Sequence, residues 1–368
     1  MFHVKHLMEV EMLQRKKITS LIINAIAIKM LLTYPKNIVL NSGNAAWIQI
    51  LYNIIITVLI FSVISLLYKS KKNIIEAAEI CGEKWLKIVV GIVVAAILTV
   101  NYISVLKIFP ETVKVILLQD TRVEAIMIVF VVVSVIGAYM GIDSISTIHY
   151  LFLPIAGVVM ISFLVLLLPY YKLDNLFPVF GNGAKSIFVT GLNSMSIFSD
   201  IILLNILMPF MKNYSEFKKS GFRAIIIGGI AAFLIMLAYC SIYPYPESKN
   251  FILPVYQLTK MIHLSSFFSR FETFFQFVWS ILILLYSSFY LYTLSYVWQI
   301  TFNLKYHKPI IIPVIICIFG LSLTQNSIMD SMRLESVISY IVYPFAFLLP
   351  VIFGIALKKV KGENHENS

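Results

Sequence analysis

Ten apolar runs of roughly membrane-spanning length follow one another along this 368-residue chain. A helix needs about 20 mainly apolar residues to cross the hydrocarbon core of a bilayer. Only 13% of the residues are charged, against about a quarter in soluble domains. We therefore predict an all-α integral membrane protein with about ten transmembrane helices, of which the fourth and the ninth are short. The apolar runs cover residues 18–35, 45–68, 88–109, 125–140, 147–170, 187–211, 224–243, 274–296, 310–323 and 337–357.

Lysine and arginine are divided unequally between the two sides that this topology implies. If residues 1–17 are cytoplasmic, the connections on that side hold about twice as many Lys and Arg residues as those opposite. Positive residues are enriched in cytoplasmic loops, so both tails, 1–17 and 358–368, should be cytoplasmic and should flank one membrane domain at 18–357. The same bias explains the net charge of +11, and we expect no nucleic-acid partner.

The residue types that carry catalysis or bind metals form no recognisable constellation. Cys81, Cys240 and Cys317 are scattered, so we expect free thiols rather than a disulfide framework. The six histidines lack metal-ligand spacing, and the chain contains no nucleotide-binding glycine loop and no nucleophile–base pair. We therefore expect no enzyme activity, no cofactor and no metal site.

A turn-rich segment at residues 172–183, KLDNLFPVFGNG, separates the first five runs from the last five. An odd number of spans per half gives the two halves opposite orientations, which is the inverted-repeat arrangement of many secondary transporters. We predict a 5+5 inverted repeat with halves at 18–173 and 184–357, and an interruption in the first span of each half. Interrupted helices place polar backbone near the bilayer midplane, where such proteins bind their ligands.

The first span of each half carries one ionisable residue ahead of a proline. Lys29 precedes Pro35 in the first span, and Asp200 precedes Pro209 in the sixth. A charge at the centre of a membrane helix costs about 3 kcal/mol on insertion scales, so it usually faces a partner charge, the protein interior or a watery cavity. Three interpretations stay open: both residues bind a ligand, they form a structural pair, or Lys29 snorkels to an interface.

Two connections have helical patterns. Between the second and third runs, apolar residues at helical spacing predict an amphipathic helix that lies along the cytoplasmic face of the membrane. On the outer side, a short helix is expected at residues 254–264. The apolar residues of the first pattern are Ile74, Ala78, Cys81, Trp85 and Ile88.

The chain also carries a series of motifs: MLLTYP followed by SGNAAWI, then YKLDNLFPVFGNG, DIILLNILMP and RFETFFQFVWSI. In these motifs and over nearly its whole length it resembles the B subunits of nutrient germinant receptors, the spore germination permeases of endospore-forming bacteria. That family belongs to the amino acid, polyamine and organocation transporter superfamily. The sequence departs from the family pattern in two places. The usual glycines are missing between Ala25 and Pro35, and Thr147 stands where an arginine is expected.

The resemblance implies a LeuT-like permease fold in the inner membrane of the spore, with a central cavity between the first, third, sixth and eighth spans. It also implies binding of a small nutrient, expected to be an amino acid, and contact with membrane lipid and with the A and C subunits of a receptor complex. Lys29 and Asp200 would offer opposite charges to the two termini of a zwitterion. The candidate ligand-binding residues are Asn24, Lys29, Thr33, Asn101, Tyr102, Asn193, Ser196, Asp200, Trp279 and Tyr286.

Tyr286, Tyr290 and Trp279 in the eighth span need a separate interpretation, because aromatic residues at helical spacing usually pack in a bundle or lie at the membrane interface.

Three function classes also stay open. The protein is a sensor that signals to partner subunits when it binds a nutrient, an ion-coupled amino acid permease, or a channel component.

Overall fold

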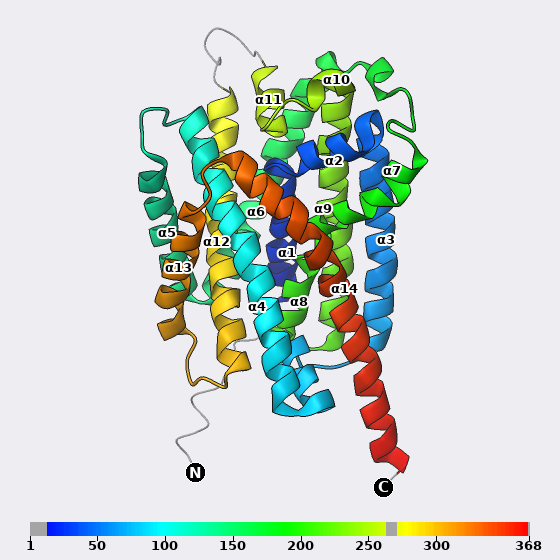
Figure 1. Cartoon of the computed structure of the whole chain (residues 1–368), viewed down its shortest axis with the longest axis vertical. Coiled ribbons are helices and arrows are strands. Elements are labelled where there is room, and N and C mark those ends of the chain that lie inside the picture. The colour runs from blue at the N-terminus through cyan, green and yellow to red at the C-terminus, as the bar shows by residue number, and fades with distance from the viewer. Residues whose placement is uncertain (1–12, 263–270, 367–368) are drawn as a thin grey trace.

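The computed structural model describes residues 13–262 and 271–366, and these residues are almost entirely helical. Most of the long helices run side by side in one bundle (Figure 1). Most of the N-terminal tail predicted at residues 1–17 lies outside the described residues. The α-helices are α1 (Arg15–Leu31), α2 (Tyr34–Ser42), α3 (Ala46–Leu67), α4 (Ile74–Ile116), α5 (Val123–Met140), α6 (Ile142–Leu167), α7 (Ala184–Phe188), α8 (Ile201–Ile206), α9 (Tyr214–Ile242), α10 (Tyr245–Ser248), α11 (Pro254–Lys260), α12 (Phe271–Thr301), α13 (Lys308–Leu323) and α14 (Ile328–Glu366).

Within the described part of the chain, seven helical stretches are long and apolar enough to cross a membrane. The outward faces of these helices are apolar. On α6, for example, Leu151, Val158 and Ile161 are each about two-thirds exposed, at 64%, 65% and 65%. Apolar surface of this extent fits lipid and not water. The predicted all-α membrane fold is thus confirmed, whereas the count of ten spans stays a prediction, because α1 and α13 are short and the sixth run is subdivided.

The first predicted interruption separates α1 from α2. Helix α1 ends at Leu31, and Leu32 has a non-helical backbone with φ −89° and ψ −123°. Helix α2 then starts at Tyr34 with Pro35 in its first turn, where a missing N–H costs no hydrogen bond. In Figure 1, α1 runs along the bundle and α2 turns across it. The end of α1 is therefore held inside the protein.

The sixth apolar run contains no continuous helix. It begins with α7, continues as the 3₁₀ helix η4 (Thr190–Phe198), turns at Ser199 and Asp200, and resumes as α8 and the short 3₁₀ helix η5 (Met208–Phe210). A 3₁₀ helix of nine residues is unusually long. Such helices are normally short because their hydrogen bonds are poorer than those of an α-helix. The interruption predicted for this run is therefore present, and it lies at Asp200.

The loop between the predicted halves packs on the end of α2 and on the short turn that connects α2 to α3. The backbone N–H of Asn182 donates to the carbonyl of Ser42 at 3.3 Å, and the Asn44 side chain donates to the carbonyl of Asn175 at 2.9 Å. Gly181 has φ +47°, and a Cβ atom there would lie 2.0 Å from the Ser42 carbonyl oxygen. Two of the sequence motifs, SGN and GNG, thus meet in space, and this contact fixes the approach to α7 and η4.

The amphipathic helix predicted between the second and third spans is only partly correct. A capping box formed by Asn73 and Glu76 starts helix α4, and Ile74 and Ala78 are buried as expected. Gly82 and Glu83 have non-helical dihedral angles, however, so the chain kinks after residue 81. Trp85 and Ile88 lie beyond the kink and are exposed, at 63% and 37%. A single apolar face through residue 88 is therefore wrong. The expected outer helix at 254–264 is present as α11, which ends at Lys260.

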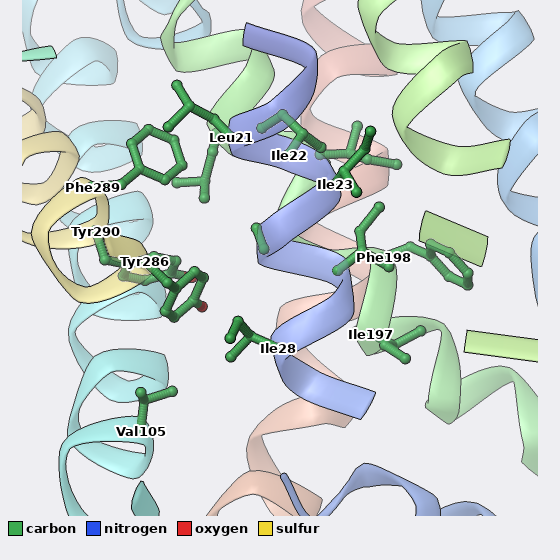
Figure 2. Packing of buried hydrophobic residues seen from close by; sticks show 14 of the residues in the cluster. Leu21, Ile22, Ile23, Ile28, Val105, Ile197, Phe198, Tyr286, Phe289 and Tyr290 are labelled. Carbon is green, nitrogen blue, oxygen red and sulfur yellow. The ribbon is translucent and has the colours of Figure 1, made fainter. Parts of the chain in front are cut away.

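Helix α1 lies at the centre of the bundle. From Ile18 to Leu31 every residue except Ala27 is buried. The helix packs against α9, α6 and α12. Figure 2 shows Ile22 and Ile28 of α1 between the aromatic residues of α12 on one side and η4 on the other. A polar side chain near the end of α1 is therefore surrounded by protein and not by lipid.

Candidate functional site

Lys29 and Asp200 form a buried ion pair at the two helix interruptions. The Nζ atom of Lys29 lies 3.1 Å from Oδ2 of Asp200, and the side chains are only 5% and 1% exposed. Lys29 comes two residues before the end of α1, and Asp200 lies in the turn between η4 and α8. The pair therefore joins the interrupted first and sixth runs. Snorkelling of Lys29 to an interface is excluded, because the amine is held inside the protein.

Lys29 uses all its hydrogen-bonding capacity within the protein. Besides the pair with Asp200, Nζ donates to the backbone carbonyl of Ser196 at 3.1 Å and to Oγ of Ser199 at 3.0 Å. An ammonium group has three N–H donors, so all three have acceptors. The amine also lies 6.0 Å from the centroid of the Tyr34 ring.

Asp200 is satisfied as completely as Lys29. Tyr290 donates its hydroxyl to Oδ1 at 2.9 Å, and Tyr286 donates to Oδ2 at 3.4 Å. The two tyrosines are four residues apart on α12, with ring centroids 4.8 Å apart, so both reach the same carboxylate. Tyr290 therefore packs in the bundle and also holds Asp200 by a hydrogen bond, which its aromatic spacing alone does not predict. The i, i+4 spacing of two hydroxyl-bearing rings opposite a membrane carboxylate was the available signal.

A cavity of about 260 Å³ lies beside the ion pair. Tyr34 and Ser196 belong both to this cavity and to the surroundings of Lys29. Its walls come from α2, η4 and α14. The lining residues are Tyr34, Asn37, Leu40, Asn41, Thr190, Asn193, Ser194, Ser196, Glu335, Ser336, Ser339 and Tyr340.

Helix α14 contacts both interruptions through side chains that line this cavity. Thr33 donates to Oε2 of Glu335 at 2.9 Å, and Ser339 donates to Oδ1 of Asn193 at 2.9 Å. Glu335 and Ser339 are four residues apart and share a face of α14. Glu335 is absent from the residues predicted from the sequence, because the tenth apolar run starts at residue 337 whereas the helix begins at Ile328. A carboxylate two residues ahead of an apolar run was the only signal.

The structure separates the predicted site residues into two groups. Asn193 and Ser196 line the cavity, Thr33 bonds to the lining residue Glu335, and Tyr286 bonds to the Lys29–Asp200 pair. The other four predicted residues neither line the cavity nor bond to the pair. They are Asn24, Asn101, Tyr102 and Trp279.

Asn24 and Trp279 belong to the packing between α1, α4 and α12. The Asn24 amide donates to the Leu282 carbonyl at 3.0 Å, and the Trp279 ring lies 6.0 Å from that of Phe109. Tyr102 packs against Tyr290 with ring centroids 6.2 Å apart, so it supports a residue that touches Asp200. The half-buried Asn101 does not line the cavity. Ligand contact by these four residues remains a prediction.

Comparison with known proteins identifies similar sequences in spore-forming bacteria. A family model described as "Spore germination protein" matches residues 12–329. The spore germination protein A2 of Bacillus subtilis (strain 168) is 24% identical over 350 residues, which is 92% of this chain and 94% of that protein. Spore germination protein B2 of the same organism is 22% identical over 256 residues, or 68% of each chain.

Solved structures of membrane transporters share the fold. Mhp1, a nucleobase-cation-symport-1 family transporter solved in a closed conformation with bromovinylhydantoin bound, aligns with a TM-score of 0.62 over 95% of this chain and 93% of Mhp1, at 13% identity. A manganese transporter of Eremococcus coleocola aligns with a TM-score of 0.60 over 91% of this chain and 78% of the transporter, at 11% identity. These likenesses establish the LeuT-like permease fold.

Proposed function

Because the chain belongs to the spore germination protein family, we propose that it is the permease-like B subunit of a nutrient germinant receptor. In this role it binds a small nutrient, expected to be an amino acid, and signals germination to partner subunits. The observation that carries the proposal is the arrangement at Asp200. A saturated buried ion pair joins two interrupted helices, and a polar cavity opens beside it.

The arrangement suits a sensor because a ligand in the cavity touches η4, which the contacts of Lys29 join to α1. Ser196 lines the cavity and accepts from Lys29, so a ligand that moves η4 also changes the surroundings of the pair. Helix α14 contacts both interruptions through Glu335 and Ser339. A ligand shifts a conformational equilibrium only when it binds two states with different affinity, and contacts to three separate elements permit such a difference.

The proposed orientation places both termini in the cytoplasm, and the proposed location is the inner membrane of the spore. Basic residues support the orientation, because Lys69, Lys71 and Lys72 follow α3 while Lys358 and Lys359 lie near the end of α14. In Figure 1 the end of α3, the start of α4 and the end of α14 lie toward the same end of the bundle. The proposed protein partners are the A and C subunits of a receptor complex, as the resemblance implies.

An ion-coupled amino acid permease is the alternative, and it is favoured by the fold shared with working transporters. Both functions need the same cavity, so binding alone does not separate them. Uptake of radiolabelled amino acids into proteoliposomes does, because a sensor binds its nutrient without net flux. A channel component would instead give ion conductance from the purified complex.

Germination of spores that lack this protein tests the proposal directly. Mutant and parent spores are exposed to a panel of amino acids, sugars and nucleosides, and release of dipicolinic acid is measured. We expect loss of the response to one nutrient class, with restoration by the wild-type gene. An unchanged response to every nutrient in a strain without redundant receptor genes would contradict the receptor role.

A further inference from the structure

Among the lining residues that the structure describes, Glu335 alone carries an ionisable carboxylate into the cavity beside the ion pair. Its other lining groups are neutral amides, hydroxyls and two phenol rings, with Leu40 as the one aliphatic side chain. The charge that a ligand meets in this cavity is therefore set by Glu335 and by whatever Lys29 and Asp200 still offer.

Lys29 and Asp200 offer little. The ammonium of Lys29 has acceptors for all three of its donors, at 3.0 to 3.1 Å. Both carboxylate oxygens of Asp200 accept hydrogen bonds, from Tyr290 and from Tyr286, and Oδ2 also faces Lys29. A ligand carboxylate would have to displace Asp200 from Lys29 to gain a cation. The pair is thus neutral and internally complete.

Glu335 differs in this respect. Its Oε2 accepts the Thr33 hydroxyl at 2.9 Å, and it forms no ion pair among the residues that the structure describes. A hydroxyl donor satisfies a lone pair but does not neutralise a charge. Carboxylates inside membrane proteins face a partner charge or a watery cavity. Here a cavity is present, and among the described residues no cationic group lies within ion-pair distance of Glu335; Lys29 acts on it only from farther away and is already paired with Asp200.

We propose that Glu335 is the counter-charge for an ammonium group on the ligand. The inference rests on the proposed function and makes it more specific: the nutrient is a small amine or amino acid, and not a sugar, a neutral nucleoside or an anion. Tyr34 and Tyr340 present aromatic rings that attract a cation, and the amide and hydroxyl oxygens accept from the remaining N–H groups. The volume of about 260 Å³ is just below the usual range for ligand pockets, about 300 to 1,000 Å³, and therefore favours a small ligand.

Glu335→Gln is the variant of choice because glutamine has nearly the same shape and keeps an oxygen that accepts from Thr33. Asp330→Asn is the matched control. Asp330 lies on the same helix, does not line the cavity, and bonds to Ser327 at its own helix start. The Asp330→Asn substitution also removes one negative charge from α14, but it leaves the cavity unchanged.

The experiment is isothermal titration calorimetry of purified protein in lipid nanodiscs, with the standard amino acids, glucose and inosine as probes. For each amino acid that binds, its carboxamide keeps the ammonium and loses the carboxylate, whereas its 2-hydroxy acid loses the ammonium. We expect the carboxamide to bind within a few-fold of the amino acid. The 2-hydroxy acid and the Glu335→Gln protein should each give about 10- to 100-fold weaker binding, the loss expected for a hydrogen bond to a charged group. The Asp330→Asn protein should bind normally.

The outcomes separate the two proposals. Binding of glucose or inosine but of no amino acid, or equal binding of the 2-hydroxy acid, would overturn the ammonium inference and leave the receptor role standing. Equal binding by wild type and a folded Glu335→Gln protein would do the same. The comparison of probes uses the wild-type protein alone. It therefore decides whether the ligand needs an ammonium group even if Glu335→Gln does not accumulate. Absence of binding to any probe would overturn both proposals.

Discussion

Lys29 and Asp200 approach to 3.1 Å between Nζ and Oδ2, and each lies where the first span of its predicted half-repeat is interrupted. The contact closes both interruptions at once, because Lys29 also bonds to Ser196 and Ser199 of the opposite segment. A buried pair of this kind leaves an uncompensated charge when either partner is lost. Loss of either charge is therefore expected to destabilise the protein.

The first prediction concerns the pair itself. Lys29→Met and Asp200→Asn should each destabilise the protein by about 3 to 5 kcal/mol, because the remaining charge is left buried, and the amount of protein in the membrane should fall. The double variant should recover much of the loss. Quantitative immunoblotting of membranes measures this, with Lys16→Met as the control because Lys16 is exposed.

If the two charges act mainly on the ligand, the results differ. Each single variant would then accumulate normally and shift the nutrient concentration needed for germination, and the double variant would stay insensitive. Normal abundance together with a normal nutrient response in both single variants would contradict any special role for the pair.

The second prediction separates the two tyrosines that hold Asp200. Tyr290→Phe should lower the free energy of unfolding by about 1.5 to 3 kcal/mol, since it removes a hydrogen bond to a charged group. Tyr286→Phe should cost less, because its bond is longer, at 3.4 Å against 2.9 Å. Thermal denaturation in detergent measures both, and Tyr52→Phe, which loses only an exposed bond, is the control. A larger loss from Tyr286→Phe would show that the distances misrank the two contacts.

The third prediction tests the contact between the central loop and the end of α2. Gly181→Ala should destabilise the protein, because the new Cβ atom would lie 2.0 Å from the Ser42 carbonyl oxygen on a backbone with φ +47°. Gly320→Ala is the matched control: no atom lies within 4 Å of its Cβ, and alanine favours a helix by about 1 kcal/mol. Equal melting temperatures for the two variants would mean that the loop does not pack as described.

The fourth prediction concerns orientation. In a background without Cys81, Cys240 and Cys317, a cysteine at Ser70 should react with an impermeant maleimide only after the membrane is opened. A cysteine at Asn250 should react in intact cells, since Asn250 is exposed, Ser70 is half-buried in a loop, and the two positions lie on opposite sides in the proposed topology. Labelling of Ser70→Cys in intact cells would reverse the proposed orientation.

The amino-acid sequence by itself determined the class of fold, and it also located the two helix interruptions. Long apolar runs admit only helices in a bilayer, because every backbone group must find its partner within the segment. An ionisable residue ahead of a proline, Lys29 before Pro35 and Asp200 before Pro209, indicated which two runs are interrupted. These are local constraints, so they can be derived from short windows of sequence.

Only the tertiary structure decided which polar groups meet. That Tyr290 and Tyr286 share Asp200, and that Glu335 faces the cavity with Thr33 as its hydrogen-bond donor, follows from how α12 and α14 pack beside the two interruptions. The kink at Gly82 likewise turned Trp85 and Ile88 outward, against their helical spacing. Periodicity specifies the face of one helix, whereas a site is formed by faces of several helices. Their relative rotation is set by packing of side chains distant in the chain.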